Sequence, residues 1–200
     1  SLLTMAITSA LGACVGLVSG FFRNRIDDVL MRICDVMMSF PSEVMILAIV
    51  GMTGPGLENV VIANVVAKWP WYARMVRSIV RQYSDKDYIR FAKVAGGSSI
   101  RIMMRHLLPG TAGELFVLTT LDTGSVILMI SALSFLGLGV QPPTPEWGMM
   151  LNEAKEVMTL YPLQMIPAGM AILLVVAAFN FLGDSLRDAF DPKHAGRERS

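Results

Sequence analysis

Two carboxylates lie inside long apolar stretches of this sequence, where an ionised group is costly. Glu43 falls within residues 33–52 and Asp122 within residues 115–140. A carboxylate in a membrane span usually faces a partner group or a water-filled path. If both side chains line a central pathway, they can meet a cationic solute such as a metal ion or a metal chelate. The alternative is that each one forms a hydrogen bond with a neighbouring helix.

The chain lacks the residue sets that most catalytic chemistry requires. It contains no Walker nucleotide-binding sequence and no serine, histidine and aspartate that could share one site. The two histidines, His106 and His194, cannot form a metal-ligand cluster, and the two cysteines, Cys14 and Cys34, are far apart. Nickel bound directly usually takes imidazole, carboxylate or thiolate ligands, and the fifteen methionines are scattered. We therefore expect neither catalysis nor a bound metal or cofactor in this chain.

The composition is typical of a membrane protein. Hydrophobic residues make up 54% of the 200 residues and charged residues 16%, with a mean hydropathy of +0.55. Soluble domains carry about a quarter charged residues. The net charge of +1 gives no indication of a nucleic-acid partner. We expect an all-α fold, a polytopic bundle of membrane helices surrounded by lipid.

Five membrane spans account for the pattern of charge. Four of them are long apolar stretches, at residues 1–22, 33–52, 115–140 and 157–183. Lysine and arginine mark the cytoplasmic side of a membrane protein. By this rule the arginines at 23, 25 and 32 place the first loop inside, and residues 68–105 must be inside as well, with nine Lys or Arg against two Asp. The chain must therefore cross a fifth time between residues 57 and 79, although hydropathy alone does not identify this span.

The same rule orients the remainder of the chain. Residues 141–161 hold one lysine against three glutamates and are expected outside, with a short helix beginning at Glu146–Trp147. We expect a membrane domain at residues 1–190, truncated at its N-terminus, followed by a cytoplasmic tail at residues 191–200. An intact chain is expected to have a sixth span upstream.

A basic, amphipathic segment interrupts the spans at residues 88–110. Apolar and basic residues recur at roughly helical spacing on both sides of Gly96–Gly97. The two glycines indicate a helix end and Ser98–Ser99 an N-cap for a second helix, which we expect Pro109 to end. The pattern predicts a helical hairpin along the cytoplasmic membrane surface, where it docks a protein partner or anchors to lipid headgroups.

Two local patterns predict contacts between or along helices. Gly12, Gly16 and Gly20 recur every four residues, so they share one helix face and allow another helix to approach closely. Arg32 and Asp35 are three residues apart and are expected to form an ion pair on one helix face.

The segment at residues 88–110 resembles the EAA loop of ABC importer permeases. The positions that correspond to the loop and to its coupling role are Tyr88, Arg90, Phe91, Ala92, Gly96 and Pro109. Arg90 and Phe91 depart from the pattern, because the family more often has a Glu and an Ala there. The resemblance implies that this segment forms a coupling helix that fits a groove on an ATP-binding subunit.

Four further stretches resemble the dipeptide, oligopeptide and nickel permease family, and its C-type subunit in particular. They lie at residues 39–41, 69–74, 133–148 and 179–188. The run at 71–77 and the position of Asp122 are most similar to the nickel branch. The resemblance implies a permease subunit, not an enzyme, that forms half of the pathway for nickel, free or chelated, or a related small solute. Dipeptides or oligopeptides are the alternative cargo.

The resemblance also implies a set of partners and a location. The partners are a second permease subunit, two ATP-binding subunits that use ATP and magnesium, and an extracytoplasmic substrate-binding protein. Residues 141–161 meet that protein or gate the outer face, and the alternative is a plain ordered loop. The location is the bacterial plasma (inner) membrane. A secondary transporter or channel subunit, and a structural or regulatory scaffold, are the remaining alternatives. Association with an ATPase distinguishes the first hypothesis from these two.

Overall fold

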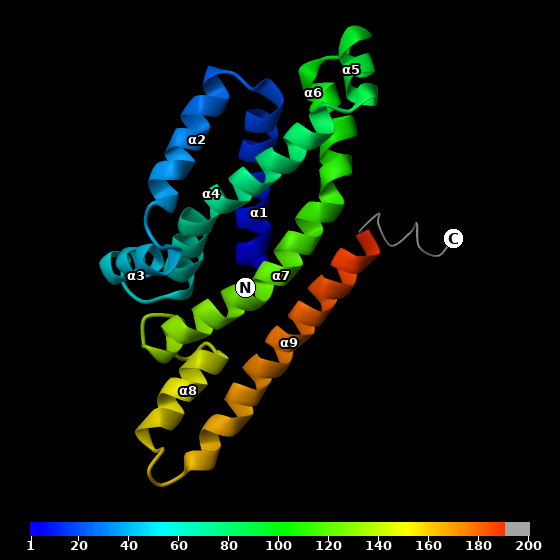
Figure 1. Cartoon of the computed structure of the whole chain (residues 1–200). Coiled ribbons are helices and arrows are strands. Elements are labelled where there is room, and N and C mark those ends of the chain that lie inside the picture. The colour runs from blue at the N-terminus through cyan, green and yellow to red at the C-terminus, as the bar shows by residue number, and fades with distance from the viewer. Residues whose placement is uncertain (191–200) are drawn as a thin grey trace.

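The computed structural model describes residues 1–190, and the tail predicted at residues 191–200 lies outside the described residues. The described part is helical and contains no β-strand, which confirms the predicted all-α fold. In chain order the elements are α1 (Leu2–Phe22), α2 (Arg25–Met38), α3 (Ser42–Thr53), α4 (Leu57–Ser84), α5 (Asp87–Val94), α6 (Ser99–Ile102), η1 (Met103–Leu107), α7 (Leu108–Phe135), α8 (Trp147–Glu156), η2 (Pro162–Gln164) and α9 (Met165–Phe190). The bundle is elongated, with α5 and α6 at one end and α8 at the other (Figure 1).

The most extensive helix contact joins α1 to α4. Gly12, Gly16 and Gly20 lie on the face of α1 that meets α4, and a larger residue at any of them would force neighbouring atoms to shift. A Cβ added at Gly12 would lie 2.2 Å from the Tyr72 Cβ, and one at Gly16 would lie 2.6 Å from the Ala73 carbonyl oxygen. Small residues therefore bring the two backbones together, as in many membrane helix pairs.

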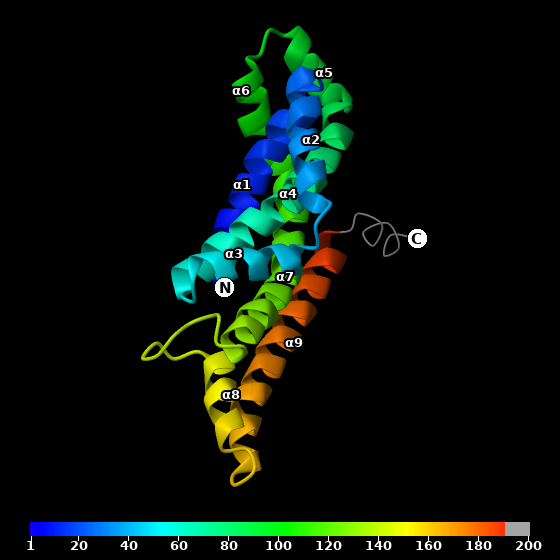
Figure 2. The ribbon, with the colours of Figure 1, turned by 90° about the vertical axis from the view of Figure 1, so that its left-hand side faces the viewer.

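The predicted second span is two helices with a sharp bend between them. The axes of α2 and α3 differ by 79°, and the break falls at residues 39–41. Pro41 occupies the N-cap of α3, and the residue before a proline is restricted to extended conformations. The predicted span at residues 33–52 is therefore a bent pair of helices, and α3 turns away from α2 across the bundle (Figure 2).

The second helix of the hairpin does not end at Pro109, contrary to prediction. Residues Ser99–Phe135 form one continuous helical segment, in which η1 is a stretch of π-helix just before the proline. The Leu108 N–H bonds to the Met103 carbonyl oxygen, five residues back. A proline in an α-helix clashes with the carbonyl four residues earlier. The wider π turn relieves that clash, so the chain continues into α7.

The second half of the bundle is formed by α7, α8 and α9. The helices α7 and α9 lie side by side over most of their length, and α8 folds back against the end of α7 (Figures 1 and 2). Only three residues of α9 are buried, namely Ala168, Ile172 and Gly183. The long apolar surface that α9 exposes is expected of a helix that faces lipid or another membrane subunit.

The spans can be compared with the prediction helix by helix. Among residues 1–190, three helical segments are long and apolar enough to cross a membrane, and the bent pair α2–α3 can form a fourth. Helix α4 coincides with the fifth predicted crossing and is 28 residues long, more than the roughly 20 that a span requires. Its charge keeps it below the hydropathy expected of a span, so the fifth crossing stays a prediction.

We expect Gly16→Ala to destabilise the bundle, since the new methyl group meets the Ala73 backbone and Val76. Overpacking of this kind costs about 1–3 kcal/mol. Gly169→Ala in α9 is the matched control, because no atom beyond the local backbone of its own helix lies within 4 Å of the added Cβ, and alanine favours a helix over glycine. Thermal unfolding of the detergent-solubilised protein should show a lower Tm for the first variant only. Equal Tm values would mean that the glycine contact is not tight.

Candidate functional site

A helical hairpin closes one end of the molecule. Helix α5 ends at Val94, where Gly96 adopts the left-handed conformation with φ of 79°. The Gly97 N–H then bonds to the Ala92 carbonyl oxygen at 3.0 Å, which is the pattern of a Schellman cap. The Ser98 hydroxyl accepts a hydrogen bond from the Arg101 N–H at 3.4 Å. The structure therefore has the turn and N-cap that the glycine and serine pairs predict.

The hairpin has a buried side and an exposed apolar side. Ile89, Ile102 and Leu107 are buried in a cluster with residues of α1 and α4, which fixes the hairpin to the bundle. The opposite side leaves Phe91 73%, Val94 87% and Ile100 70% exposed. Soluble surfaces carry single exposed apolar residues, but three on one short hairpin suit a site that meets another molecule.

The remaining hairpin positions singled out from the sequence lie around this surface. Arg90 is exposed and Ala92 is half-buried. The Tyr88 ring is tilted against that of His106, with 6.4 Å between their centroids. Pro109 is exposed and lies within the helical segment that leads into α7. Tyr88, Phe91 and Gly96 thus belong to the hairpin itself, whereas Pro109 belongs to its connection with the bundle.

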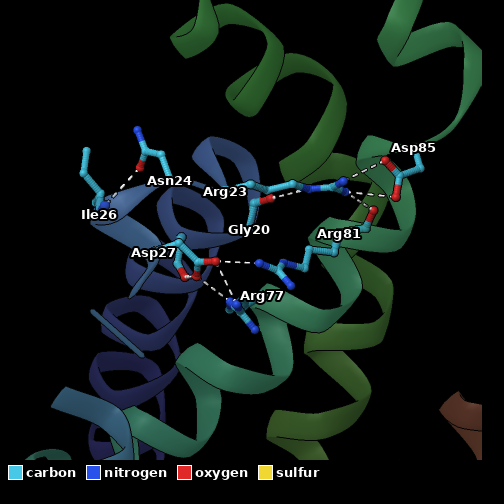
Figure 3. Close-up of polar contacts among 9 residues, drawn as sticks. Gly20, Arg23, Asn24, Ile26, Asp27, Arg77, Arg81 and Asp85 are labelled. Atoms are coloured by element: carbon cyan, nitrogen blue, oxygen red, sulfur yellow. Dashed lines mark hydrogen bonds and ion pairs between the residues drawn. The ribbon is translucent and has the colours of Figure 1, made fainter. Parts of the chain in front are cut away.

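A buried carboxylate ties the helices together beside the hairpin (Figure 3). Asp27 of α2 is 1% exposed and accepts hydrogen bonds from Arg77 Nε at 2.5 Å and Nη2 at 2.7 Å. Arg81 Nη2 donates to the same carboxylate at 2.5 Å, and the Ser19 hydroxyl of α1 donates as well. Charge-assisted and bidentate contacts of this kind are the stronger hydrogen bonds in proteins. One carboxylate therefore joins α1, α2 and α4.

A second ion pair links the end of α1 to the start of the hairpin. Arg23 donates to Asp85 through both of its terminal nitrogens, at 2.9 and 3.0 Å, and to the Arg81 carbonyl oxygen at 2.7 Å (Figure 3). The hydrogen bond from Arg23 lowers the pKa of Asp85 and keeps this carboxylate charged. Lys93 of α5 also lies over the Phe21 ring, 4.8 Å from its centroid. The hairpin is thus held by α1 as well as by α4.

Sequence reasoning missed the Asp27 network and misassigned Asp35. Asp35 forms its salt bridge with Arg74 of α4 and not with Arg32. Arg74, Arg77 and Arg81 are separated from their carboxylates by about 40 to 55 residues, so helical spacing gives no signal for them. The sequence shows the basic residues at 68–105, but their acidic partners are identified only by the packing of α2 beside α4.

The two carboxylates that the sequence singled out line one cavity. It has a volume of about 460 Å³ and lies between the α2–α3 bend, α4 and α7, where Glu43 and Asp122 both contribute to its wall. Asp122 accepts hydrogen bonds from Lys68 Nζ at 2.8 and 3.1 Å and from the Tyr72 hydroxyl at 3.0 Å. Glu43 accepts one from the Ser42 hydroxyl at 3.0 Å. Asp122 therefore bonds to a neighbouring helix, which is the alternative to a role in the pathway that the sequence left open. Glu43 is exposed.

The far end of the molecule is held by Glu146, the N-cap of α8. Its carboxylate accepts hydrogen bonds from the Met149 N–H at 2.9 Å and from the Ser131 hydroxyl of α7 at 2.8 Å. Asn152 donates to the Phe135 carbonyl oxygen at 2.5 Å. The short helix expected at Glu146–Trp147 is confirmed. It is fixed to the end of α7, opposite the hairpin (Figure 1).

Comparison with known proteins gives a consistent result. Residues 12–195 match the family model described as "Binding-protein-dependent transport system inner membrane component". The chain is 44% identical over 174 residues to the metal-staphylopine import system permease protein CntC of Staphylococcus aureus, which covers 87% of this chain and 60% of that protein. It is 40% identical over 188 residues to the nickel transport system permease protein NikC of Escherichia coli K12, covering 94% and 68%.

A third relative is named for the transport of glutathione and not of a metal. The chain is 44% identical over 190 residues to the glutathione transport system permease protein GsiD of Escherichia coli O6:K15:H31, covering 95% of this chain and 63% of that protein. The chain therefore spans about three fifths to two thirds of the length of the curated relatives it matches.

We expect Asp27→Asn to lower the stability of the bundle by about 2 kcal/mol, because it removes charge-assisted hydrogen bonds to two partly exposed arginines. Asp28→Asn is the matched control. It makes the same charge change in the same turn of α2 at an exposed position, where loss of the helix-dipole interaction costs at most about 1 kcal/mol. Thermal unfolding in detergent measures both, and equal shifts in Tm would contradict a stabilising role for the network.

Proposed function

The chain belongs to the family of binding-protein-dependent transport system inner membrane components, and on that premise we propose that it is a transmembrane permease subunit of an ATP-driven importer. Its location is the bacterial plasma (inner) membrane. The predicted relationship to permeases of the peptide and nickel family is confirmed by the relatives. The observation that carries the proposal is the hairpin, which is anchored on one side and leaves three apolar side chains exposed on the other.

The hairpin is the coupling element in this proposal. Its exposed surface of Phe91, Val94 and Ile100 docks into a groove on one of two partner ATP-binding subunits, which use ATP and magnesium. The turn at Gly96 sets the angle between α5 and α6, since its φ of 79° is one that few other residues adopt. Arg90 and Tyr88 flank the docked surface, and Ala92 supports it from the half-buried side.

The cavity is the candidate translocation pathway. This chain supplies one wall through Glu43 and Asp122, and a second permease subunit supplies the other. Each solute arrives from an extracytoplasmic substrate-binding protein at the α8 end. The cargo we propose is nickel, free or chelated, or a related small solute. The alternative is a dipeptide or oligopeptide, which the identity to a glutathione permease favours.

Phe91→Asp is expected to release the partner ATPase while leaving the bundle folded, because Phe91 is exposed and its new charge would be buried in the docked groove. The measurement is the ATPase activity that co-purifies with the tagged full-length protein from membranes. Glu153→Lys, a charge change on an exposed residue of α8, is the control and should retain that activity. A secondary transporter, a channel or a scaffold would bring no ATPase with it in either form.

Uptake by cells with and without the intact transporter distinguishes the cargoes. Under the nickel proposal, deletion of this chain removes most high-affinity uptake of radioactive nickel and leaves dipeptide uptake unchanged. Restoring the full-length chain restores nickel uptake, which excludes an effect on neighbouring genes. Loss of dipeptide uptake with normal nickel uptake would favour the peptide alternative.

A further inference from the structure

The charges that line the cavity at the α2–α3 bend do not balance. Lys68 and Asp122 neutralise each other through two contacts of 2.8 and 3.1 Å, and their side chains are only 17% and 19% exposed. The Tyr72 hydroxyl, itself buried, holds the same carboxylate at 3.0 Å. Glu43 is the third charged residue of the lining. Among residues 1–190 it has no salt bridge, so the part of the cavity that this chain supplies carries about one net negative charge.

The rest of the lining suits an organic cation. Phe40, Trp71 and Met38 contribute aromatic and thioether surface to the same cavity. The Trp71 ring packs edge to face against the Tyr72 ring, with 4.9 Å between the ring centroids. Aromatic rings attract ammonium and guanidinium groups, and more strongly where water is excluded. A carboxylate beside aromatic surface therefore complements a solute that has both a positive charge and apolar parts.

A bare metal ion fits this cavity less well. Metal sites in proteins use several ligands from one compact group, and no group of three or more His, Cys, Asp or Glu lies together in the part of the chain that the structure describes. Asp122 is already occupied by Lys68 and Tyr72. One carboxylate remains, which is enough to attract an ammonium group but too few ligands to hold a dehydrated metal.

We propose that the cavity selects solutes bearing a protonated amine or another organic cation, with Glu43 as the recognising carboxylate and the Lys68–Asp122 pair as a neutral wall. The proposal rests on the proposed function, because it concerns the solute that the permease moves. It narrows the cargo to amine-containing molecules, which include peptides and metal chelates with an ammonium group, and it disfavours the free metal ion.

Thiol modification measures the charge preference of the cavity directly. Ser125 lines the cavity, so Ser125→Cys introduces a reporter, in a Cys14→Ser background that retains the buried Cys34. The full-length transporter complex in membrane vesicles is treated with two methanethiosulfonates of similar size, one ending in trimethylammonium and one in sulfonate. The same background without the reporter gives the blank, and a small thiol in solution gives the intrinsic ratio of the two rates.

The cationic reagent is expected to react about fivefold faster than the anionic one after this correction, as a single charge at close range in a partly aqueous site would produce. Glu43→Gln should bring the ratio to about one. Glu58→Gln, an exposed carboxylate on α4 outside the cavity lining, should leave it unchanged. A ratio that does not respond to Glu43→Gln overturns the proposal.

Protection of the Ser125→Cys thiol from modification tests whether the cavity prefers an organic cation or a metal ion. Ethylammonium chloride should slow the modification of the Ser125→Cys protein more than nickel(II) chloride does at equal charge concentration. Equal or greater protection by nickel would overturn the assignment to organic cations.

The proposed function has a separate readout in the same vesicles. An importer driven by ATP should change the modification rate of the reporter when ATP and magnesium are added. If added ATP does not change the modification rate while the cationic reagent still reacts faster than the anionic one, the importer assignment fails and the cation preference stands. If the rate responds to ATP but the ratio is one, only the cation preference fails.

Discussion

The close contact between α1 and α4 determines where the other parts of the molecule lie. Gly12, Gly16 and Gly20 let the two backbones meet, so that an added Cβ at any of them falls within 3.0 Å of α4 atoms. In lipid there is little hydrophobic drive for helices to associate, and close packing takes its place. Once α4 is fixed against α1, its C-terminal end supports the hairpin and its middle forms one wall of the cavity.

Helix α4 packs within the bundle although it is charged. Its four basic residues from Lys68 to Arg81 each reach an acid on another element: Lys68 reaches Asp122 of α7, Arg74 reaches Asp35 of α2, and Arg77 and Arg81 share Asp27. Charges inside a membrane are tolerated when they pair with one another or face a water-filled cavity. Hydropathy sums the residues of α4 alone and takes no account of charges that are paired with neighbouring helices, so the fifth crossing stays a prediction.

The sequence predicted those features that depend on neighbours along the chain. The glycine repeat, the Gly96–Gly97 turn, the Ser98 cap and the helix after Glu146 all follow from spacing of a few residues. Hydropathy predicts one span at residues 33–52 but carries no information on backbone direction, so it does not give the 79° between α2 and α3. Pro109 was misjudged because the π turn that accommodates it depends on residues 103–107 adopting a rarer geometry. The Asp27 network was invisible because its members are about 50 residues apart.

The misjudged proline has a mechanical consequence. If Pro109 ended the second hairpin helix, a loop would separate the hairpin from the bundle and absorb its movement. Instead, one helical segment runs from Ser99 to Phe135, with the exposed Ile100 at one end and Ser131, which holds Glu146, near the other. Asp122 of the cavity lies between them. A force applied to the hairpin therefore reaches both the cavity wall and helix α8 through a single helix, and the π turn is the one place along it where the hydrogen-bond pattern departs from that of an α-helix.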